Sequence, residues 1–141
     1  MPIERRDILF YLNEFWPHFL LKGLGRCDLD GKIEDDLPVD LTHTRNLQKM
    51  SQDRRDRFKE LLGHDAVTRP GLLVTTIKRG FVGKEKPFGF LIPENIAYDV
   101  LTDLCMREEI RLPKNAKKEV IADNLMIGLR ITMDQSGLEL E

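Results

Sequence analysis

Residues 72–92, LLVTTIKRGFVGKEKPFGFLI, constrain the fold of this chain more than any other segment. Two short runs rich in β-branched and aromatic residues flank a glycine-containing turn, which predicts two antiparallel strands joined as a hairpin. In the second run, Phe88, Phe90 and Ile92 share one face. The rest of the chain must therefore supply the layers that cover a β-hairpin.

Helical periodicity is found on both sides of this hairpin, and the order of elements favours an antiparallel sheet over a parallel βαβ fold. Pro17 lies inside the first periodic segment and predicts a kink or a break there. The expected elements are a helix over 4–22, a loop over 26–43, a helix from about 44 or 51 to 62, the hairpin over 72–92, a helix over 94–109, a candidate short helix over 114–124 and a closing hairpin over 127–140.

These elements predict an α+β fold: a small single domain over residues 1–141, with N-terminal helices and antiparallel hairpins with one helix between them. The helical part is expected at about 1–64 and the mixed hairpin and helix part at about 70–141. A length of 141 residues is enough to bury an independent core.

Apolar residues make up 41% of the chain and charged residues 33%, as in globular rather than disordered proteins. The longest apolar-rich run, residues 8–21, is too short and too interrupted by polar residues to span a bilayer. No signal peptide is recognisable at the N-terminus. Cys27 and Cys105 lie far apart and are expected to be free thiols in a reducing compartment, so the expected location is the cytoplasm.

Charge is distributed unevenly along the chain. Residues 1–40 carry a net charge of −4, residues 41–90 carry +6 and residues 91–141 carry −4. A basic middle between acidic ends is what a protein with an anionic partner needs. The same pattern also fits an acidic cover folded over the basic segment, and the sequence leaves both interpretations open.

The leading functional prediction is a non-enzymatic binding protein that contacts nucleic acid through a basic helix and a basic, aromatic hairpin. Cations neutralise phosphates, and aromatic rings stack on bases. An ordinary amphipathic hairpin has the same pattern, with apolar residues inside and lysines outside. The candidate phosphate contacts are Arg54, Arg55, Arg57, Lys78, Arg79, Lys84 and Lys86, and the candidate stacking residues are Phe81, Phe88 and Phe90.

The main alternative is a protein–protein interaction or homodimerisation module that uses the aromatic first helix. Its aromatic residues point around most of the helix, more than one core-facing stripe requires, and aromatic residues are enriched at interfaces. Burial beneath the sheet is the other interpretation. The candidate interface residues are Tyr11, Phe15, Trp16 and Phe19.

A small enzyme is a third alternative, although no motif supports it and no catalytic residue, cofactor or metal is predicted. The two cysteines and three histidines show no zinc-ligand spacing. A phosphate-binding loop is absent, and the acidic loop lacks essential calcium ligands. An active site would need a cleft that gathers His43 or His64 with Cys27 or with the acids of residues 28–40.

Residues 86–94, KPFGFLIPE, followed by Asp99 and Val100, resemble the core signature of cold-shock domains. Those domains are small barrels that bind single-stranded nucleic acid on exposed aromatic residues. The resemblance implies base stacking by Phe88 and Phe90 and a phosphate contact by Lys86.

The resemblance covers only about fifteen residues, and the chain departs from the family at several points. Pro87 stands where the family has glycine, and no aromatic–histidine motif follows Val100. Residues 94–109 have helical periodicity where the family has a strand. We therefore do not assign the chain to this family.

Overall fold

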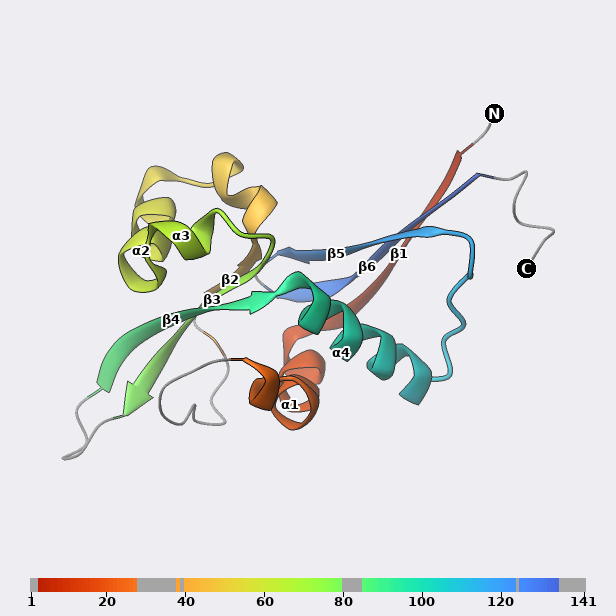
Figure 1. Ribbon diagram of the computed structural model, residues 1–141, viewed down its shortest axis with the longest axis horizontal. Helices are drawn as coiled ribbons and strands as arrows, with labels where there is room; N and C mark the ends of the chain where they lie inside the picture. Colours follow the sequence, from red (N-terminus) through yellow and green to blue (C-terminus); the bar gives the residue numbers. More distant parts are fainter. Residues whose placement is uncertain (1–2, 28–37, 39, 80–84, 124, 135–141) are drawn as a thin grey trace.

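The fold is built on one antiparallel sheet whose six strands are ordered β1-β6-β5-β2-β3-β4 (Figure 1). The computed structural model describes residues 3–27, 38, 40–79, 85–123 and 125–134. The strands are β1 (Ile3–Tyr11), β2 (Asp40–His43), β3 (Gly71–Arg79), β4 (Glu85–Pro93), β5 (Lys117–Asp123) and β6 (Met126–Asp134).

Helices cover the sheet on both sides, but to different extents (Figure 1). Helices α1 and α4 form one layer, while η2, α2 and α3 lie on the opposite face, over β3 and β4. The α-helices are α1 (Leu12–Lys22), α2 (Gln52–Leu62), α3 (His64–Val67) and α4 (Glu94–Arg107), and the 3₁₀ helices are η1 (Leu24–Arg26) and η2 (Thr44–Lys49). None of the helices in the described part of the chain is both long and apolar enough to cross a membrane.

The alternation of side chains along β3 divides the interior into two cores. Leu72 and Val74 pack in the large core under α1 and α4, whereas Leu73 packs in a smaller core with Phe58 of α2. Because successive residues of a strand point to opposite faces, a single apolar run serves both layers. This explains why residues 72–74 are apolar at consecutive rather than alternate positions.

The predicted α+β class is confirmed, and so are its central elements. The hairpin forms as β3 and β4, with Leu72 opposite Ile92. Helix α2 ends before Gly63, which has a φ of 91°, and α4 occupies the third helical segment. Both cysteines are free thiols, with Cys105 buried.

The prediction of a helix over residues 4–22 is wrong in its first half. Residues 3–11 form β1, in which Ile8 pairs with Leu129 and Phe10 with Ile127. The run from residue 8 to 11 is wholly apolar and therefore fits a strand as well as a helix. Pairing with β6 decides between them, and it is helped by Gly128, where any Cβ would overlap the carbonyl oxygen of Ile8.

Three further local predictions are corrected. α1 runs unbroken through Pro17, so the predicted break is wrong. The residues expected as a loop contain β2, and the candidate helix over 114–124 contains β5. The C-terminal hairpin is therefore β5–β6, and residues 135–141 lie outside the described part of the chain. Strands β1 and β2 come from the part predicted to be helical, and they share the sheet with strands of the mixed part.

Candidate functional site

The aromatic residues of α1 belong to the core. Phe15, Trp16 and Phe19 are fully buried, with ring centroids of Trp16 and Phe19 5.2 Å apart. Their prediction as a partner interface is therefore wrong, because all three lie on the one face of α1 that packs on the sheet and on α4. Tyr11 of the same prediction is 61% exposed, but it belongs to the end of β1.

The hairpin aromatics are also mostly internal. Phe90 is 4% exposed and stacks on Phe19, with ring centroids 6.4 Å apart. It cannot stack on a base without unfolding, so this prediction is wrong. Phe88 is half-buried against the same core, with its ring centroid 6.0 Å from that of Phe90. Phe81 lies outside the described residues.

The basic residues predicted in the hairpin can be located only in part. Lys86 is exposed. The strand positions of Lys78 and Arg79 are described, but their side chains are not, and Lys84 lies outside the described part. By strand alternation Lys86 shares the face of Phe88, whereas Gly89 faces Leu61 and Leu62 of α2.

The single basic and aromatic surface predicted from the sequence is therefore split between two faces of the hairpin. The basic helix α2 packs on one face of β4, and the aromatic residues of β4 point to the other. The sequence places these groups close together along the chain, but it does not show on which side of the sheet each lies.

The arginines of α2 differ in their partners. Arg54 donates from Nε and Nη2 to the carboxylate of Asp40, at 2.8 and 2.6 Å, and this contact raises the pKa of Arg54. Within the part of the chain that the structure describes, Arg55, Arg57 and Lys59 form no ion pair. Their charges are therefore not matched by a carboxylate, unlike the charge of Arg54.

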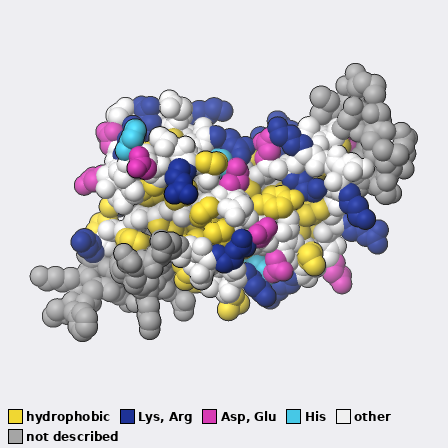
Figure 2. Space-filling model, in the orientation of Figure 1, with side chains coloured by type: hydrophobic (Ala, Val, Ile, Leu, Met, Phe, Trp, Pro, Cys, Tyr) yellow, Lys and Arg dark blue, Asp and Glu magenta, His cyan; other side chains and the backbone are white. Residues whose placement is uncertain are grey.

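A cleft of about 390 Å³ lies between η2, α2 and α3 and is lined by basic and neutral residues. None of its lining residues is acidic. We call this site the basic cleft, and Lys, Arg and His side chains are visible over this part of the surface, with acidic side chains among them (Figure 2). The lining residues are Thr44, Arg45, Leu47, Gln48, Arg55, Lys59, His64, Val67 and Thr68.

Arg55 is the cleft residue with spare hydrogen-bonding capacity. Its Nη2 donates to Oε1 of Gln52 at 2.6 Å, a neutral partner. Its Nε is buried and has no hydrogen-bond partner. Buried donors are nearly always paired in native proteins, so an unpaired one on a residue that lines a cleft indicates a hydrogen bond that a ligand could supply after the side chain rotates.

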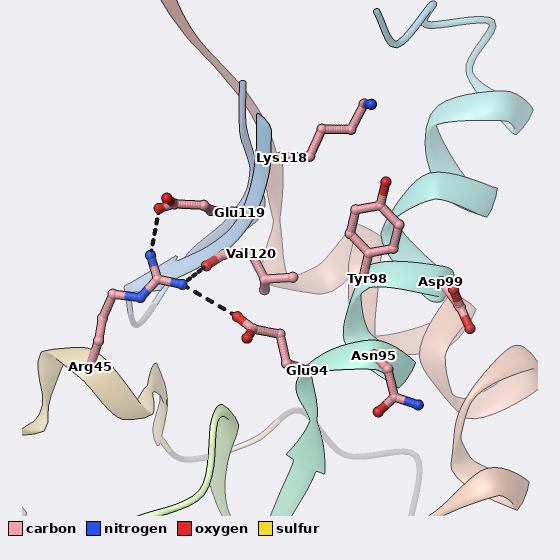
Figure 3. Close-up of a pocket in the computed structure, with 8 residues that line it drawn as sticks. All are labelled: Arg45, Glu94, Asn95, Tyr98, Asp99, Lys118, Glu119 and Val120. Carbon is pink, nitrogen blue, oxygen red and sulfur yellow. Dashed lines mark hydrogen bonds and ion pairs between the residues drawn. The ribbon is translucent and has the colours of Figure 1, made fainter. Parts of the chain in front are cut away.

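A second cleft, of about 480 Å³, lies where η2, α4 and β5 meet (Figure 3). Its centre is Arg45, which donates to Glu119 at 3.0 Å, to Glu94 at 3.3 Å and to the carbonyl oxygen of Val120 at 2.9 Å. We call this arrangement the Arg45 clasp. Tyr98, Asn95 and Asp99 of α4 and Lys118 of β5 lie on the side of the cleft away from Arg45 (Figure 3).

His43 supports the clasp from inside. Its Nδ1 accepts from the backbone N–H of Arg45 at 3.1 Å, so in the neutral ring the proton is on Nε2, which lies 2.7 Å from Oε1 of Glu94. Burial lowers the pKa of His43, and the hydrogen bond to Glu94 only partly opposes this shift. His43 is therefore a neutral, buried ring with both nitrogens in use.

The charges of the clasp are balanced within the protein, because Arg45 and Lys117 together face Glu94 and Glu119. Arg45 is shared between two carboxylates, and the pKa of Glu119 is lowered first by its hydrogen bond to Lys117 and then by Arg45. These contacts join η2 to α4 and β5, which fixes the part of the chain that leads into α2. The main charged groups of this cleft are thus used in holding the fold together.

Among the described residues, those named for an enzyme do not line one cleft. His43 belongs to the clasp and His64 to the basic cleft. Burial raises the pKa of the Cys27 and Cys105 thiols, which disfavours the thiolate that a nucleophile requires. Residues 28–37 lie outside the described part. Among the residues that are described, no group of three or more His, Cys, Asp or Glu side chains is placed to hold a metal ion.

Sequence reasoning missed the clasp, and of the residues that line the basic cleft it predicted only Arg55 as a phosphate contact. His43 and Glu94 are 51 residues apart, and Arg45 and Glu119 are 74 apart. No local motif marks such pairs. The spacing of Arg55 and Lys59, four residues apart on a predicted helix, was the available signal for the basic cleft.

Comparisons with known proteins give no relative: no protein-family model, no curated protein and no solved structure matches this chain.

Proposed function

We propose that the protein binds nucleic acid through the exposed side of α2. The observation that carries this proposal is the contrast between matched and unmatched cations. Arg26, Arg45, Arg54 and Arg130 each pair with a carboxylate. In the described part of the chain the exposed cations of α2 have no such partner, so their charges are free to neutralise phosphates.

The mechanism is phosphate neutralisation along the helix rather than base reading. Arg55 and Lys59 lie on one flank of α2 and Arg57 lies on the other. The exposed acidic residues Asp53, Asp56 and Glu60 lie between the two flanks, so the phosphate contacts are made along the flanks and not along the outermost line of the helix. Phe90 is buried and cannot stack. We therefore expect weak sequence preference and an affinity that falls steeply with salt.

The test is fluorescence anisotropy with labelled single- and double-stranded oligonucleotides at about 50 and 200 mM salt, the range where counterion release is pronounced. The expected result is binding that weakens with salt and is strongly reduced by the triple variant Arg55→Gln, Arg57→Gln and Lys59→Gln. The matched control removes the same charge elsewhere, with Lys22→Gln, Arg107→Gln and Arg111→Gln, all at exposed positions.

Two results would contradict the proposal. One is the absence of binding at the lower salt concentration. The other is an equal loss of affinity in the control variant, which would show that net charge rather than α2 is responsible. The cytoplasmic location expected from the sequence also stays a prediction, and fractionation of cells that express the tagged protein would test it.

A further inference from the structure

We infer that the basic cleft is a seat for a phosphomonoester, the terminal phosphate at a nucleic-acid end. This inference rests on the proposed function and deepens it, because it names the group that the cleft recognises. It concerns the cleft between η2, α2 and α3, and not the opposite flank of α2, where Arg57 lies.

The geometry brings donors from three elements to one place. Arg55 and Lys59 are four residues apart on α2 and therefore lie on the same side of the helix. His64 begins α3 and Gln48 belongs to η2, and both line the same cleft. An anion seated there would be contacted from several directions, which is what distinguishes a seat from a flat charged surface.

Charge favours a monoester over an internal phosphate. Arg55 and Lys59 supply two positive charges, and none of the described residues that line the cleft is acidic. Arg45 also lines it, but its charge is matched by Glu94 and Glu119. A phosphomonoester carries about −1.5 to −2 at pH 7, whereas a phosphodiester within a strand carries one negative charge. The two unmatched cations therefore fit the terminal phosphate better.

The unpaired Nε of Arg55 is the second observation that points to a ligand. A guanidinium offers five donors in a planar fork and binds phosphate oxygens in pairs. In the present arrangement only Nη2 has a side-chain partner, the neutral Gln52. A rotation of the guanidinium toward the cleft would allow Nε and one Nη to donate to two phosphate oxygens together.

The size of the cleft limits what else can enter. Its volume of about 390 Å³ is near the lower end of the roughly 300–1,000 Å³ found for small-ligand pockets. This is room for a terminal nucleotide and not for several nucleotides. The cleft would therefore hold the end of a strand while the exposed side of α2 contacts the phosphates that follow.

The experiment compares three versions of one short single-stranded oligonucleotide: with a 5′-phosphate, with a 3′-phosphate, and with hydroxyl groups at both ends. The label is attached to a base in the middle so that both ends are free. We expect about tenfold tighter binding for at least one phosphorylated end, since charge-assisted hydrogen bonds of this kind contribute about one tenfold step or more. The two phosphorylated versions distinguish a 5′ from a 3′ source.

The variants locate the seat. Arg55→Gln with Lys59→Gln should remove the preference for the phosphorylated end. Arg57→Gln should keep the preference for the phosphorylated end, because Arg57 lies roughly 200° around the helix from Arg55 and from Lys59. The overall affinity should fall in both variants. Thermal melts of each variant check that the fold is retained.

The outcomes separate the two claims. Equal affinity for phosphorylated and hydroxyl ends overturns this inference and leaves the proposed function standing. Loss of the preference in Arg57→Gln overturns the assignment to the cleft. If none of the three oligonucleotides binds, the proposed function is overturned, and this inference with it.

Discussion

Helices α1 and α2 have the same length, 11 residues, and lie on opposite faces of the sheet, yet they are held in different ways. α1 buries five residues, among them Phe15, Trp16 and Phe19. α2 buries only Phe58 and carries charged residues over most of its remaining surface. Both helices have an exposed outer side, but α1 contributes a large aromatic face to the core and α2 contributes a single aromatic residue.

The difference separates two uses of a helix. A helix that buries several aromatic residues on one face, as α1 does, is held in place by that burial. A helix held by one aromatic side chain and a few contacts at its ends can present cations that form no ion pair with the described residues. The polar contacts at η2, before α2, supply the anchoring that burial does not.

The largest expected effect is on the α1 side. Trp16→Ala removes a fully buried indole and should lower the free energy of unfolding by about 3–5 kcal/mol, as measured by chemical denaturation. Trp16→Phe should cost much less, about 1.5 kcal/mol or below. The smaller loss is expected because the phenyl ring still fills most of the space of the indole, and removal of Nε1, which is buried without a hydrogen-bond partner, sacrifices no hydrogen bond in either variant. A similar cost for both variants would contradict this account.

An intermediate effect is expected where α2 meets the sheet. A Cβ at Gly89 would overlap Cδ1 of Leu62 and lie 2.9 Å from Cβ of Leu61. Gly89→Ala should therefore displace α2 and cost about 1–3 kcal/mol. Gly25→Ala is the control, because a Cβ there meets nothing within 4 Å, and its melting temperature should stay near that of the unchanged protein. Equal melting temperatures for the two variants would show that α2 is not packed closely on β4.

A smaller effect is expected from acid, and it acts on the anchor of the α2 side. The pKa of His43 is lowered from 6.5 in the folded protein, chiefly by burial. The unfolded chain therefore binds a proton at His43 more readily than the folded protein does. The free energy of unfolding is not reduced by this residue above pH 6.5, and it decreases as the pH falls below 6.5. Protonation of Nδ1 would also break its hydrogen bond with the N–H of Arg45.

The measurement is the free energy of unfolding between pH 5 and pH 8 for the unchanged protein and for His43→Asn. The variant should be less stable at neutral pH but should lack the decline below pH 6.5. A decline of the same size in both proteins would assign it to other groups, such as the carboxylates.

The sequence was sufficient to predict those helices and strands whose hydrophobic pattern fits only one type of secondary structure. The hairpin over 72–92, α2 and α4 have clear periods and clear ends, such as Gly63, and they form as predicted. β1 and β5 were missed because a short apolar run such as residues 8–11 satisfies both periods, and only its partner strand decides. The burial of Trp16 and Phe90 likewise depends on contacts between distant segments.

The same limit applies to the candidate site. The cations of α2 could be named from the sequence, because a basic helix is a local feature. Which of them are free could not, because Asp40 pairs with Arg54 and not with Arg57, and that choice depends on the path of the chain between them. Composition therefore identified the helix, whereas the structure identified its unmatched residues.

The smallest effects on stability are expected within α2 itself, where the comparison can be made between two arginines. Arg54→Gln removes a two-bonded contact to Asp40 and should cost about 1 kcal/mol, a value kept low because the guanidinium is 37% exposed. Arg57→Gln breaks no ion pair in the described part of the chain, so its free energy of unfolding should stay within about 0.5 kcal/mol of the original.

In binding the order should reverse. Arg57→Gln should reduce the slope of log affinity against log salt by about 0.7–0.9 if it removes one phosphate contact, and Arg54→Gln should leave that slope nearly unchanged. If both variants change the slope equally, pairing with a carboxylate does not decide which cations of α2 bind a ligand, and the distinction between an arginine that holds the fold and one that contacts a partner fails.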